Sequence, residues 1–257
     1  MHEDLPLARR DLIASRLAQG QAVVAATLAA EFSVSEDAIR RDLRALAADG
    51  LCRRVYGGAL PVSAATSPMA ARIDVAAARK EALAKAALQT VQSGELLFLD
   101  SGSTNLALVD LLPDDADVTV ATNSIDIAAA VVRRQDIKLV LIGGGVDLLV
   151  GGSVDAAAVQ ALLQLNIDRC FIGACSVSTG SGVSAFNGSD AAFKRAVLKQ
   201  SRHSLVLATS EKMAMRAHHR IADLRDFEYL VVEHDLPTAE LEELKQGGAV
   251  VLQAANP

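Results

Sequence analysis

The sequence predicts two domains: a small helical domain with a short β wing, then an α/β domain built on a doubly wound, mostly parallel sheet. Three observations lead to this prediction. A helix with a marked start and a row of arginines lies over residues 35–46. Proline, serine, threonine and alanine fill residues 61–68, a composition typical of a linker. Beyond residue 94, seven short apolar runs alternate with helical stretches, the pattern of strands joined by helical crossovers.

The helix over residues 35–46 is the feature around which the first domain is organised. Ser35 is a good N-cap, and Glu36 and Asp37 suit the positive end of the helix dipole. The apolar stripe of this helix consists of Ala38, Ile39, Leu43 and Leu46, and the arginines largely off that stripe are Arg40, Arg41 and Arg44. Such a helix suits a DNA major groove, although an ordinary amphipathic surface helix fits this segment equally well.

The segments around this helix favour DNA binding. We predict one helix over residues 7–17 and a second, shorter helix from residues 23–24 and 27–32, with a tight connection at residues 32–34. Two short helices joined in this way make a helix-turn-helix. Asp49 and Gly50 stop the arginine-bearing helix, and residues 51–59 predict a hairpin or wing that carries Arg53 and Arg54.

The linker divides the chain into a first domain over residues 1–60, a linker over residues 61–68 and a second domain over residues 69–257. After the linker, residues 69–92 predict one long, alanine-rich helix with Lys80, Glu81 and Lys85 exposed. The predicted strands then cover residues 96–99, 118–121, 138–142, 170–172, 204–208, 229–232 and 249–252. The predicted helices between them cover residues 105–111, 125–134, 156–165, 191–201 and 238–246.

Small and polar residues follow the predicted strands, where open parallel sheets bind their ligands. Glycines let the backbone approach a ligand, and the free N–H groups of a helix start hold anions. Each loop alone is a weak signal, but five on one edge, the last ending in a lysine, indicate a site for a phosphorylated polyol or sugar. The predicted site comprises Asp100, Ser101, Gly102, Ser103, Thr104, Thr122, Asn123, Gly143, Gly144 and Lys212.

Residues 8–60 resemble the DNA-binding domain of the deoxyribose-operon repressor (DeoR) family. The resemblance rests on Phe32-Ser33-Val34-Ser35, Ile39-Arg40-Arg41-Asp42-Leu43, Gly50-Leu51, Arg53-Arg54 and Tyr56-Gly57-Gly58-Ala59. Ala38 stands where the family commonly has threonine, so one hydroxyl that contacts phosphate is missing. The residues expected to bind DNA are Ser35, Glu36, Asp37, Ala38, Arg40, Arg41, Arg44, Arg53, Arg54 and Tyr56.

The second domain also resembles this family. The resemblance rests on Lys80-Glu81, Phe98-Leu99-Asp100-Ser101-Gly102-Ser103-Thr104, Thr122-Asn123-Ser124, Ile142-Gly143-Gly144, Asp168, Phe171-Ile172-Gly173 and Lys194-Arg195. It implies a sensor with a fold related to sugar-phosphate isomerases and a phosphorylated sugar as effector. The family often has Asp-Ser-Ser-Lys-Phe-Gly after the fifth strand, whereas residues 208–214 here keep only Ser210 and Lys212 of that run.

Charge and composition limit the function classes. The net charge is −6, which excludes a generally basic nucleic-acid coat, and residues 1–58 carry eight basic and eight acidic residues. DNA affinity must therefore come from local arrangement. Cys52, Cys170 and Cys175 form no Cys-x-x-Cys pair, and we see neither a signal peptide nor a membrane span. We expect a cytoplasmic protein with no cofactor and no metal.

These observations predict a regulator, most simply a repressor of a sugar or polyol catabolic operon, that binds double-stranded operator DNA as a homodimer or higher homo-oligomer. A phosphorylated sugar-type effector would release or modulate it. The alternative is an isomerase-like enzyme carrying a DNA-binding domain, with Asp100 as general base and Lys212 as its electrostatic partner. A protein-binding scaffold is a third reading. His203, His218, His219 and His234 lack the spacing of a metal site, and we interpret them as surface or salt-bridge residues.

Overall fold

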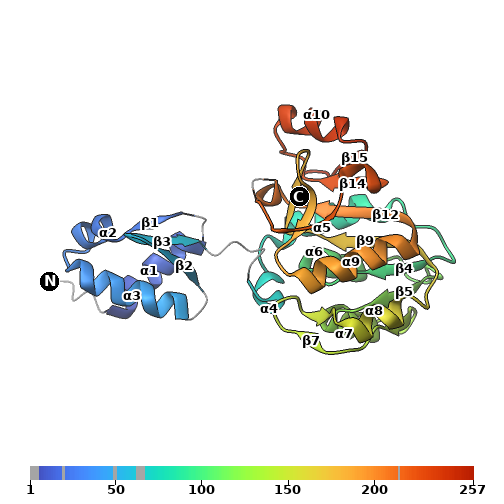
Figure 1. Cartoon of the computed structure of the whole chain (residues 1–257), viewed down its shortest axis with the longest axis horizontal. Coiled ribbons are helices and arrows are strands. Elements are labelled where there is room, and N and C mark those ends of the chain that lie inside the picture. The colour runs from blue at the N-terminus through green and yellow to red at the C-terminus, as the bar shows by residue number, and fades with distance from the viewer. Residues whose placement is uncertain (1–5, 19–20, 49–50, 62–66, 214) are drawn as a thin grey trace. The chain divides into compact units, whose positions relative to one another are not determined.

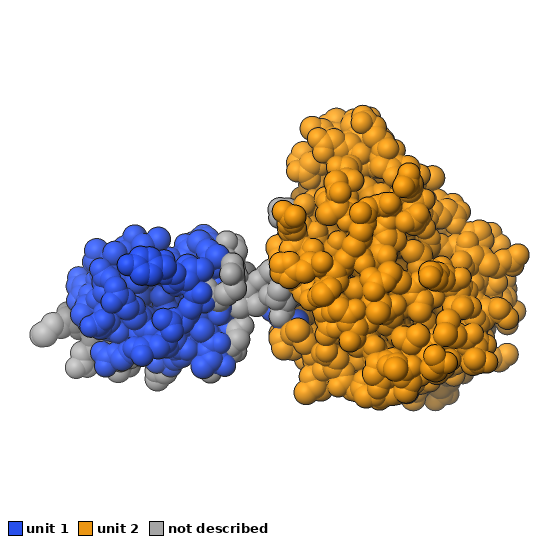
Figure 2. Space-filling model, in the orientation of Figure 1, with its two compact units in different colours: residues 1–67 blue, residues 68–257 orange. Residues whose placement is uncertain are grey.

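The computed structural model describes residues 6–18, 21–48, 51–61, 67–213 and 215–257. The chain divides into two compact units, residues 1–67 and residues 68–257, which Figure 2 colours separately. The linker predicted over residues 61–68 falls mainly on residues 62–66, which lie outside the described part of the chain.

The N-terminal unit has three helices and a small sheet. Its elements are α1 (Pro6–Ala18), β1 (Val23–Val24), α2 (Ala25–Glu31), α3 (Glu36–Ala48), β2 (Cys52–Val55) and β3 (Gly58–Pro61). The strands pair antiparallel in the order β1-β3-β2. Residues 23–24 therefore belong to a strand, whereas the sequence analysis places them in the second helix. The prediction is wrong because β3 offers these residues a hydrogen-bonding edge that local propensity does not reveal.

The turn between α2 and α3 is set by local geometry. Ser33 adopts the left-handed backbone conformation, with φ at 51°, which reverses the chain within four residues. The Ser35 hydroxyl then accepts a hydrogen bond from the Ala38 N–H at 3.2 Å, so it caps α3 as the sequence predicts. Ile39, Leu43 and Leu46 of α3 are buried in the core of this unit. Helix α3 is thereby fixed by one face while its other face stays open.

A buried ion pair ties α3 to α1. Asp42 lies on the buried face of α3 and is 3% exposed, and its carboxylate accepts from Arg9 Nε at 2.7 Å. The guanidinium of Arg10 approaches the other oxygen of the same carboxylate at 3.5 Å. Because a buried carboxylate is costly without a partner, Arg9 and Asp42 specify how the two helices cross.

The C-terminal unit is built on a sheet of seven strands, all paired parallel. The strands are β4 (Leu96–Leu99), β5 (Thr119–Thr122), β6 (Lys138–Leu141), β9 (Ile167–Gly173), β12 (Ser201–Ala208), β14 (Tyr229–Val232) and β15 (Val250–Gln253). Their spatial order is β15-β14-β12-β9-β4-β5-β6 (Figure 1). The order reverses between β4 and β9, and in such sheets the point of reversal opens a crevice at the strand ends. All seven strands overlap the runs that the sequence predicts.

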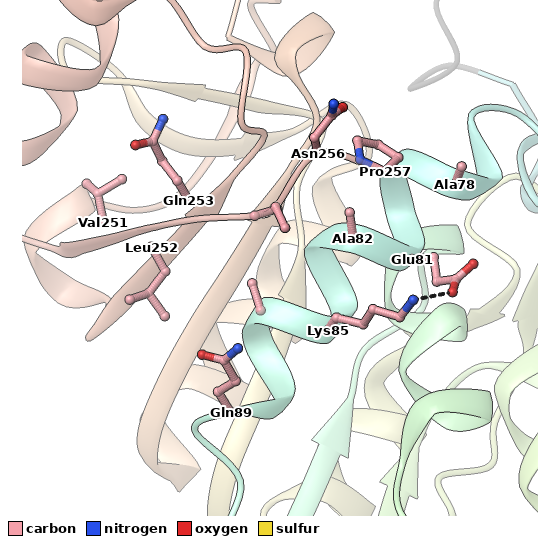
Figure 3. Close-up of a pocket in the computed structure, with 13 residues that line it drawn as sticks. Ala78, Glu81, Ala82, Lys85, Gln89, Val251, Leu252, Gln253, Asn256 and Pro257 are labelled. Atoms are coloured by element: carbon pink, nitrogen blue, oxygen red, sulfur yellow. Dashed lines mark ion pairs between the residues drawn. The ribbon is translucent and has the colours of Figure 1, made fainter.

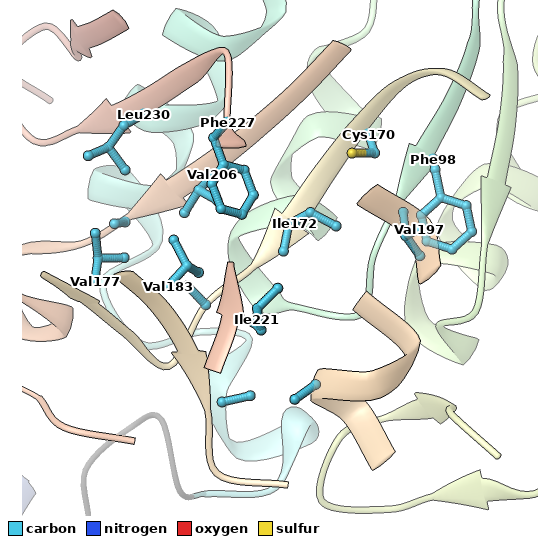
Figure 4. Packing of buried hydrophobic residues seen from close by; sticks show 14 of the residues in the cluster. Phe98, Cys170, Ile172, Val177, Val183, Val197, Val206, Ile221, Phe227 and Leu230 are labelled. Atoms are coloured by element: carbon cyan, nitrogen blue, oxygen red, sulfur yellow. The ribbon is translucent and has the colours of Figure 1, made fainter. Parts of the chain in front are cut away.

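Helices cover both faces of the sheet. One face carries α5 (Ala77–Leu88), α6 (Ser103–Leu111) and α7 (Ile125–Arg133), and the other carries α8 (Ala156–Leu162), α9 (Gly188–Gln200) and α10 (Thr238–Gln246). The second face is also covered by a three-stranded antiparallel sheet of β10 (Ser176–Ser178), β11 (Gly182–Ala185) and β13 (His219–Ala222). Figure 4 shows Val177, Val183 and Ile221 of that small sheet facing Ile172 and Val206 of the large one.

Residues 69–92 do not form the single helix that we predicted. They form α4 (Met69–Arg72) and α5, separated by a bend in which Ala76 takes the left-handed conformation with φ at 54°. Lys80, predicted to be exposed, is 6% exposed, and its ammonium donates to the carbonyl oxygens of Arg72 and Ile73. The ammonium thus satisfies carbonyls at the end of α4, and this tertiary contact overrides the helical propensity of the alanine-rich run.

The C-terminal unit also contains a short hairpin and two 3-10 turns. A hairpin of β7 (Val146–Asp147) and β8 (Gly152–Ser153) follows β6, and 3-10 turns η2 (Ser210–Lys212) and η3 (Leu224–Asp226) follow β12 and β13. Among the helices that the structure describes, none is both long and apolar enough to cross a membrane.

Asp42→Ala tests the ion pair between α1 and α3. Arg9 would be left buried without its carboxylate, so the N-terminal unit should lose about 3–5 kcal/mol of stability. Hydrogen exchange of the full chain should quicken in α1 and α3 and stay unchanged in the C-terminal unit. Asp37→Ala, at an exposed position on the same helix, is the control. Equal exchange in the two variants would contradict a structural role for Asp42.

Candidate functional site

The open face of α3 presents three arginines, which differ in their partners. Arg40 pairs with Glu36 at 2.7 Å and with Asp37 at 3.4 Å on its own helix. Arg41 is exposed and makes no ion pair within the part of the chain that the structure describes. Arg44 is exposed and donates to the Arg40 carbonyl at 3.3 Å. Arg41 and Arg44 are therefore available to an anionic partner, whereas Arg40 must first leave its acids.

The other predicted DNA-binding residues surround this face. Ser35, Glu36 and Asp37 are exposed at the start of α3, and Ala38 is half-buried behind them. On the β2–β3 hairpin, Arg54 and the fully exposed Tyr56 face solvent, and Tyr56 sits at the turn. The side chain of Arg53 lies outside the described residues. Helix α3 packs against β2, so the hairpin arginine and the arginines of α3 belong to one small unit.

The second predicted site lies where the sheet order reverses, at the ends of β4 and β9. Asp100 follows β4 and is fully buried, and its carboxylate accepts from the Gly173 N–H at the end of β9 at 2.8 Å. The next residue, Ser101, donates its N–H to Asn123 Oδ1 beyond β5 at 3.1 Å. The Ser101 hydroxyl is buried and has no hydrogen-bond partner. Three strand-end loops are thus joined into one polar edge.

The remaining predicted residues lie around this edge with different degrees of contact. The Thr122 hydroxyl donates to the Leu99 carbonyl at 2.6 Å, so it supports the strands. Asn123 donates to the Ser153 carbonyl at 3.1 Å, and the Ser153 hydroxyl reaches the Gly144 carbonyl at 3.4 Å. Ser103 and Thr104 begin α6 directly after Gly102, and Gly143 is exposed after β6. No described hydrogen bond connects Lys212 to this set.

A buried ammonium that the sequence analysis did not assign to the site holds the edge together. Lys194 of α9 is 3% exposed and lies 3.4 Å from Asp100 Oδ2 and 2.5 Å from Asp190 Oδ2. Burial opposes the charge of Lys194, but the carboxylates of Asp100 and Asp190 outweigh it and raise the pKa of its ammonium. Burial raises the pKa of Asp100 to about 7, against the lowering effect of Lys194. One oxygen of each carboxylate remains without a partner.

Three further cations gather beside this triad: Arg72 of α4, Lys80 of α5 and Lys212 of η2. Burial, together with the charges of Lys212 and Arg72, lowers the pKa of Lys80 to about 8. Burial likewise lowers the pKa of Lys212 to about 8, with Arg72 and Lys194 acting in the same direction. None of the three forms an ion pair with a carboxylate among the residues that the structure describes. Glu211 and Asp74 offset part of the charge of the lysines, and Asp100 and Asp190 offset part of that of Arg72. Because none of these acids pairs directly with the three cations among the described residues, the cations remain available to an anionic ligand.

Lys212 owes its position to a network at the end of β14. Glu233 is 3% exposed and accepts from the Ser210 N–H at 2.7 Å and the Ser210 hydroxyl at 2.6 Å, and it pairs with Arg79 of α5. These contacts fix η2 between α5 and β14. The Lys212 ammonium then donates only a long hydrogen bond, 3.4 Å, to the Leu207 carbonyl. The ammonium is held near Lys80 and Arg72 while retaining donors for a ligand.

One sequence signal would have found the missed lysines. Lys80 shares a spacing of three, four and seven residues with Leu83, Ala84 and Ala87, all buried on α5. Lys194 stands on the buried stripe of α9 in the same way. A lysine on the apolar stripe of a helix is buried by the helix periodicity, so it needs a partner in the core. For Arg72 the sequence carries no comparable signal, because α4 is a single turn.

Two other features lie away from this edge. His203 pairs with Glu228 at 2.6 Å, and among the described residues no group of three or more His, Cys, Asp or Glu is placed to hold a metal. A groove of about 620 Å³ runs between α5 and the C-terminal residues after β14, with the Glu81–Lys85 ion pair on its rim (Figure 3). The residues that line this groove, all of them described, include none of the predicted effector-binding residues.

Two family models match the chain. The model of the DeoR-like helix-turn-helix domain matches residues 9–65, and that of the DeoR C terminal sensor domain matches residues 75–234. The matched regions contain α3 with its arginines and the polar edge with Lys80, Lys194 and Lys212.

The chain is also similar to two repressors and to one solved structure. The putative aga operon transcriptional repressor of Escherichia coli O157:H7 is 29% identical over 248 residues, or 95% of this chain and 92% of that protein. The glycerol-3-phosphate regulon repressor of Escherichia coli (strain K12) is 29% identical over 191 residues, or 74% and 76%. Among solved structures, ribose 5-phosphate isomerase A from Methanocaldococcus jannaschii aligns with 53% of this chain and 54% of its own, at 19% identity and a TM-score of 0.39.

Lys194→Met tests the buried triad. The variant leaves Asp100 and Asp190 buried without the ammonium, so the free energy of unfolding should fall by about 3–5 kcal/mol at pH 7.5. Burial already holds the pKa of Asp100 above its unfolded value in wild type, and loss of the ammonium raises it further. The folded variant then binds more protons than its unfolded chain, and the deficit against wild type should shrink towards pH 5.

Urea unfolding followed by circular dichroism at both pH values measures this. Lys199→Met, at an exposed position on the same helix, is the control, and Asp190→Asn combined with Lys194→Met should recover part of the loss. A deficit that grows on acidification would contradict the assignment.

Proposed function

The chain belongs to the DeoR family of DNA-binding transcriptional regulators, and we propose that it represses a sugar or polyol catabolic operon under the control of a phosphorylated effector. The observation that carries the proposal is the pairing, in one chain, of two cationic surfaces. One is the open face of α3 in the N-terminal unit, and the other is the cluster of Arg72, Lys80 and Lys212 in the C-terminal unit. Both lack carboxylate partners for most of their charge, and both suit phosphate groups.

For the N-terminal unit we propose that residues 1–60 form a winged helix-turn-helix domain whose helix α3 enters the major groove. Arg41 and Arg44 would contact bases or phosphates directly, and Arg54 and Tyr56 would contact the backbone from the wing. Arg40 would have to break its ion pairs with Glu36 and Asp37 before it could contact DNA. The cost of breaking them lowers its net contribution to binding, so only a well-placed DNA contact would offset that cost. The near balance of charge in residues 1–58 makes this local arrangement decisive.

One such domain offers a small interface, so we propose a homodimer or higher homo-oligomer on a repeated operator. The half-sites would lie on one face of the DNA, near one helical turn or a multiple apart. Binding chromosomal DNA would place the protein in the cytoplasm.

For the C-terminal unit we propose that residues 69–257 bind the effector at the polar edge. Lys212 would hold the phosphate, together with Arg72 and Lys80, which the sequence analysis left out of the site. The N–H groups at the start of α6 and the Ser101 hydroxyl would hold the rest of the effector. Asp100, which we predicted to be part of the effector site, is fully buried and holds Lys194, so we propose that it positions the edge and does not reach the ligand.

The enzyme alternative has a direct test. An isomerase would need Asp100 to reach a substrate proton, but this carboxylate is fully buried and its Oδ2 is held by Gly173 and Lys194. The two relatives described above are repressors by name, which supports regulation. Incubating the protein with a panel of sugar phosphates and following aldose–ketose conversion would separate the two functions, because a sensor binds its ligand without turning it over.

Arg41→Ala tests the DNA-binding face. Operator sequences are first selected from random DNA with the wild-type protein, and they should contain two half-sites. The variant should bind them more weakly by about 1–3 kcal/mol if Arg41 reads a base. Arg54→Ala should instead weaken binding to all sequences about equally and reduce the salt slope by about one.

Fluorescence anisotropy at two salt concentrations measures both effects. Arg202→Ala, at an exposed position of the C-terminal unit, is the matched control. If Arg41→Ala and Arg44→Ala both bind the selected DNA like wild type while remaining folded, α3 is not the recognition helix.

Lys212→Ala tests the effector site. The effector is first identified as the sugar phosphate that raises the melting temperature in a thermal-shift panel. The variant should lose the effect of that compound on operator affinity while binding operator normally without it. Operator titrations with and without the compound measure both quantities, with Lys245→Ala as the control for an exposed lysine. A variant that still responds at wild-type concentrations would remove Lys212 from the site.

A further inference from the structure

Helix α4 is attached to the rest of the C-terminal unit by a few contacts. Met69 is 1% exposed and packs against Gly151, where an added Cβ would lie 2.4 Å from that of Met69. The guanidinium of Arg72 donates to the Leu149 carbonyl at 3.4 Å, a long hydrogen bond. Lys80 donates to the carbonyls of Arg72 and Ile73 from α5. A helix of one turn cannot hold itself together, so its tertiary contacts, including these, keep α4 in place.

The charges at the same place act against these contacts. Arg72 is the cation that α4 contributes to the cluster, while Lys80 belongs to α5 and Lys212 to η2. Like charges on three separate elements repel one another, and this repulsion adds to burial in lowering the pKa values of both lysines. The acids Glu211, Asp74, Asp100 and Asp190 offset part of the repulsion without pairing directly with the three cations among the described residues. Arg72 Nε is buried and has no hydrogen-bond partner among the residues that the structure describes. The guanidinium therefore has an unused donor, and an anion among the three cations would satisfy it.

We propose that α4 is a strap that an anion closes: a phosphate or sulfate group held by Arg72, Lys80 and Lys212 pins residues 68–76 onto the C-terminal unit. Without the anion, α4 is held by Met69 and by the carbonyl contacts of Lys80, against the repulsion of the cations. With it, the same three charges attract a common partner and bind α4, α5 and η2 together. This inference rests on the proposed effector site and adds the structural change that effector binding would cause.

The place of α4 in the chain gives the strap its consequence. Pro68 begins the C-terminal unit, so residues 68–76 are the first part of that unit to follow the N-terminal unit in sequence. When the anion holds residues 68–76 against the C-terminal unit, it fixes the point at which the chain from the N-terminal unit enters the C-terminal unit. An effector changes DNA affinity only if it binds two states of the protein unequally. A strap that is closed with the anion and loosened without it supplies those two states.

Hydrogen exchange of the full chain tests the strap, with sulfate as the probe at low millimolar concentration and chloride at matched ionic strength as the reference. In wild type, sulfate should raise the melting temperature and slow exchange of residues 68–76 by about tenfold. In Arg72→Gln the segment should exchange quickly even at sulfate concentrations that saturate the wild-type protein. Lys85→Gln, an exposed lysine of α5 that pairs with Glu81, should behave like wild type, which corrects for general stabilisation by sulfate.

The outcomes separate the strap from the site. If sulfate raises the melting temperature of wild type more than that of Arg72→Gln but leaves exchange of residues 68–76 unchanged, the strap is wrong and the anion site stands. If sulfate acts equally on wild type and Arg72→Gln in both measurements, the anion site itself is wrong. Slowed exchange in wild type that Arg72→Gln abolishes and Lys85→Gln keeps supports both.

Discussion

The buried ammonium of Lys194 is the interaction on which the functional edge of the C-terminal unit depends. A parallel sheet brings its strand ends to one edge, but it does not by itself hold the loops there in a fixed relation. Lys194 does so by joining Asp100 at the end of β4 to Asp190 of α9, while Asp100 also takes the N–H at the end of β9. Charges this deep are tolerated only as a matched set, so the loops cannot shift singly without exposing an unpaired charge. Arg72, Lys80 and Lys212 therefore lie beside loops whose positions are fixed relative to one another.

The large elements follow from the sequence because each has a pattern of its own. Apolar runs mark the seven strands of the main sheet, and Ser35 with its following acids marks the start of α3. The misses have a common cause. Residues 23–24 form a strand only because β3 lies beside them, and the break between α4 and α5 depends on an ammonium reaching back from Lys80. The strands β7, β8, β10, β11 and β13 have two to four residues each, too few to show a period.

The candidate site divides in the same way. The polar loops after β4, β5, β6 and β12 could be found because strand ends share an edge, whatever the details of packing. Of the four cations at that edge, only Lys212 was predicted. The apolar stripes of α5 and α9 place Lys80 and Lys194 in the core and could have revealed them, whereas Arg72 lies on a single turn that gives no such signal. In the N-terminal unit the arginines are where the helix pattern puts them. These arginines differ in their partners: Arg40 pairs with Glu36, whereas Arg41 makes no ion pair among the described residues. This difference depends on side-chain geometry, which sequence spacing alone does not determine.

The two cationic surfaces, that of α3 with the wing and that of Arg72, Lys80 and Lys212, differ in how far their charges are exposed to solvent. The arginines of α3 and the wing are exposed, so counterions screen them, and binding to DNA must depend steeply on salt. Arg72, Lys80 and Lys212 are partly or fully buried, and their charges are screened much less. A small dianion can therefore be held at ionic strengths where the same number of exposed cations would bind it weakly. The cost is the mutual repulsion of those cations in the empty site, and because one of them stands on α4, relief of that repulsion is bound to act on the segment that leads to the DNA-binding unit.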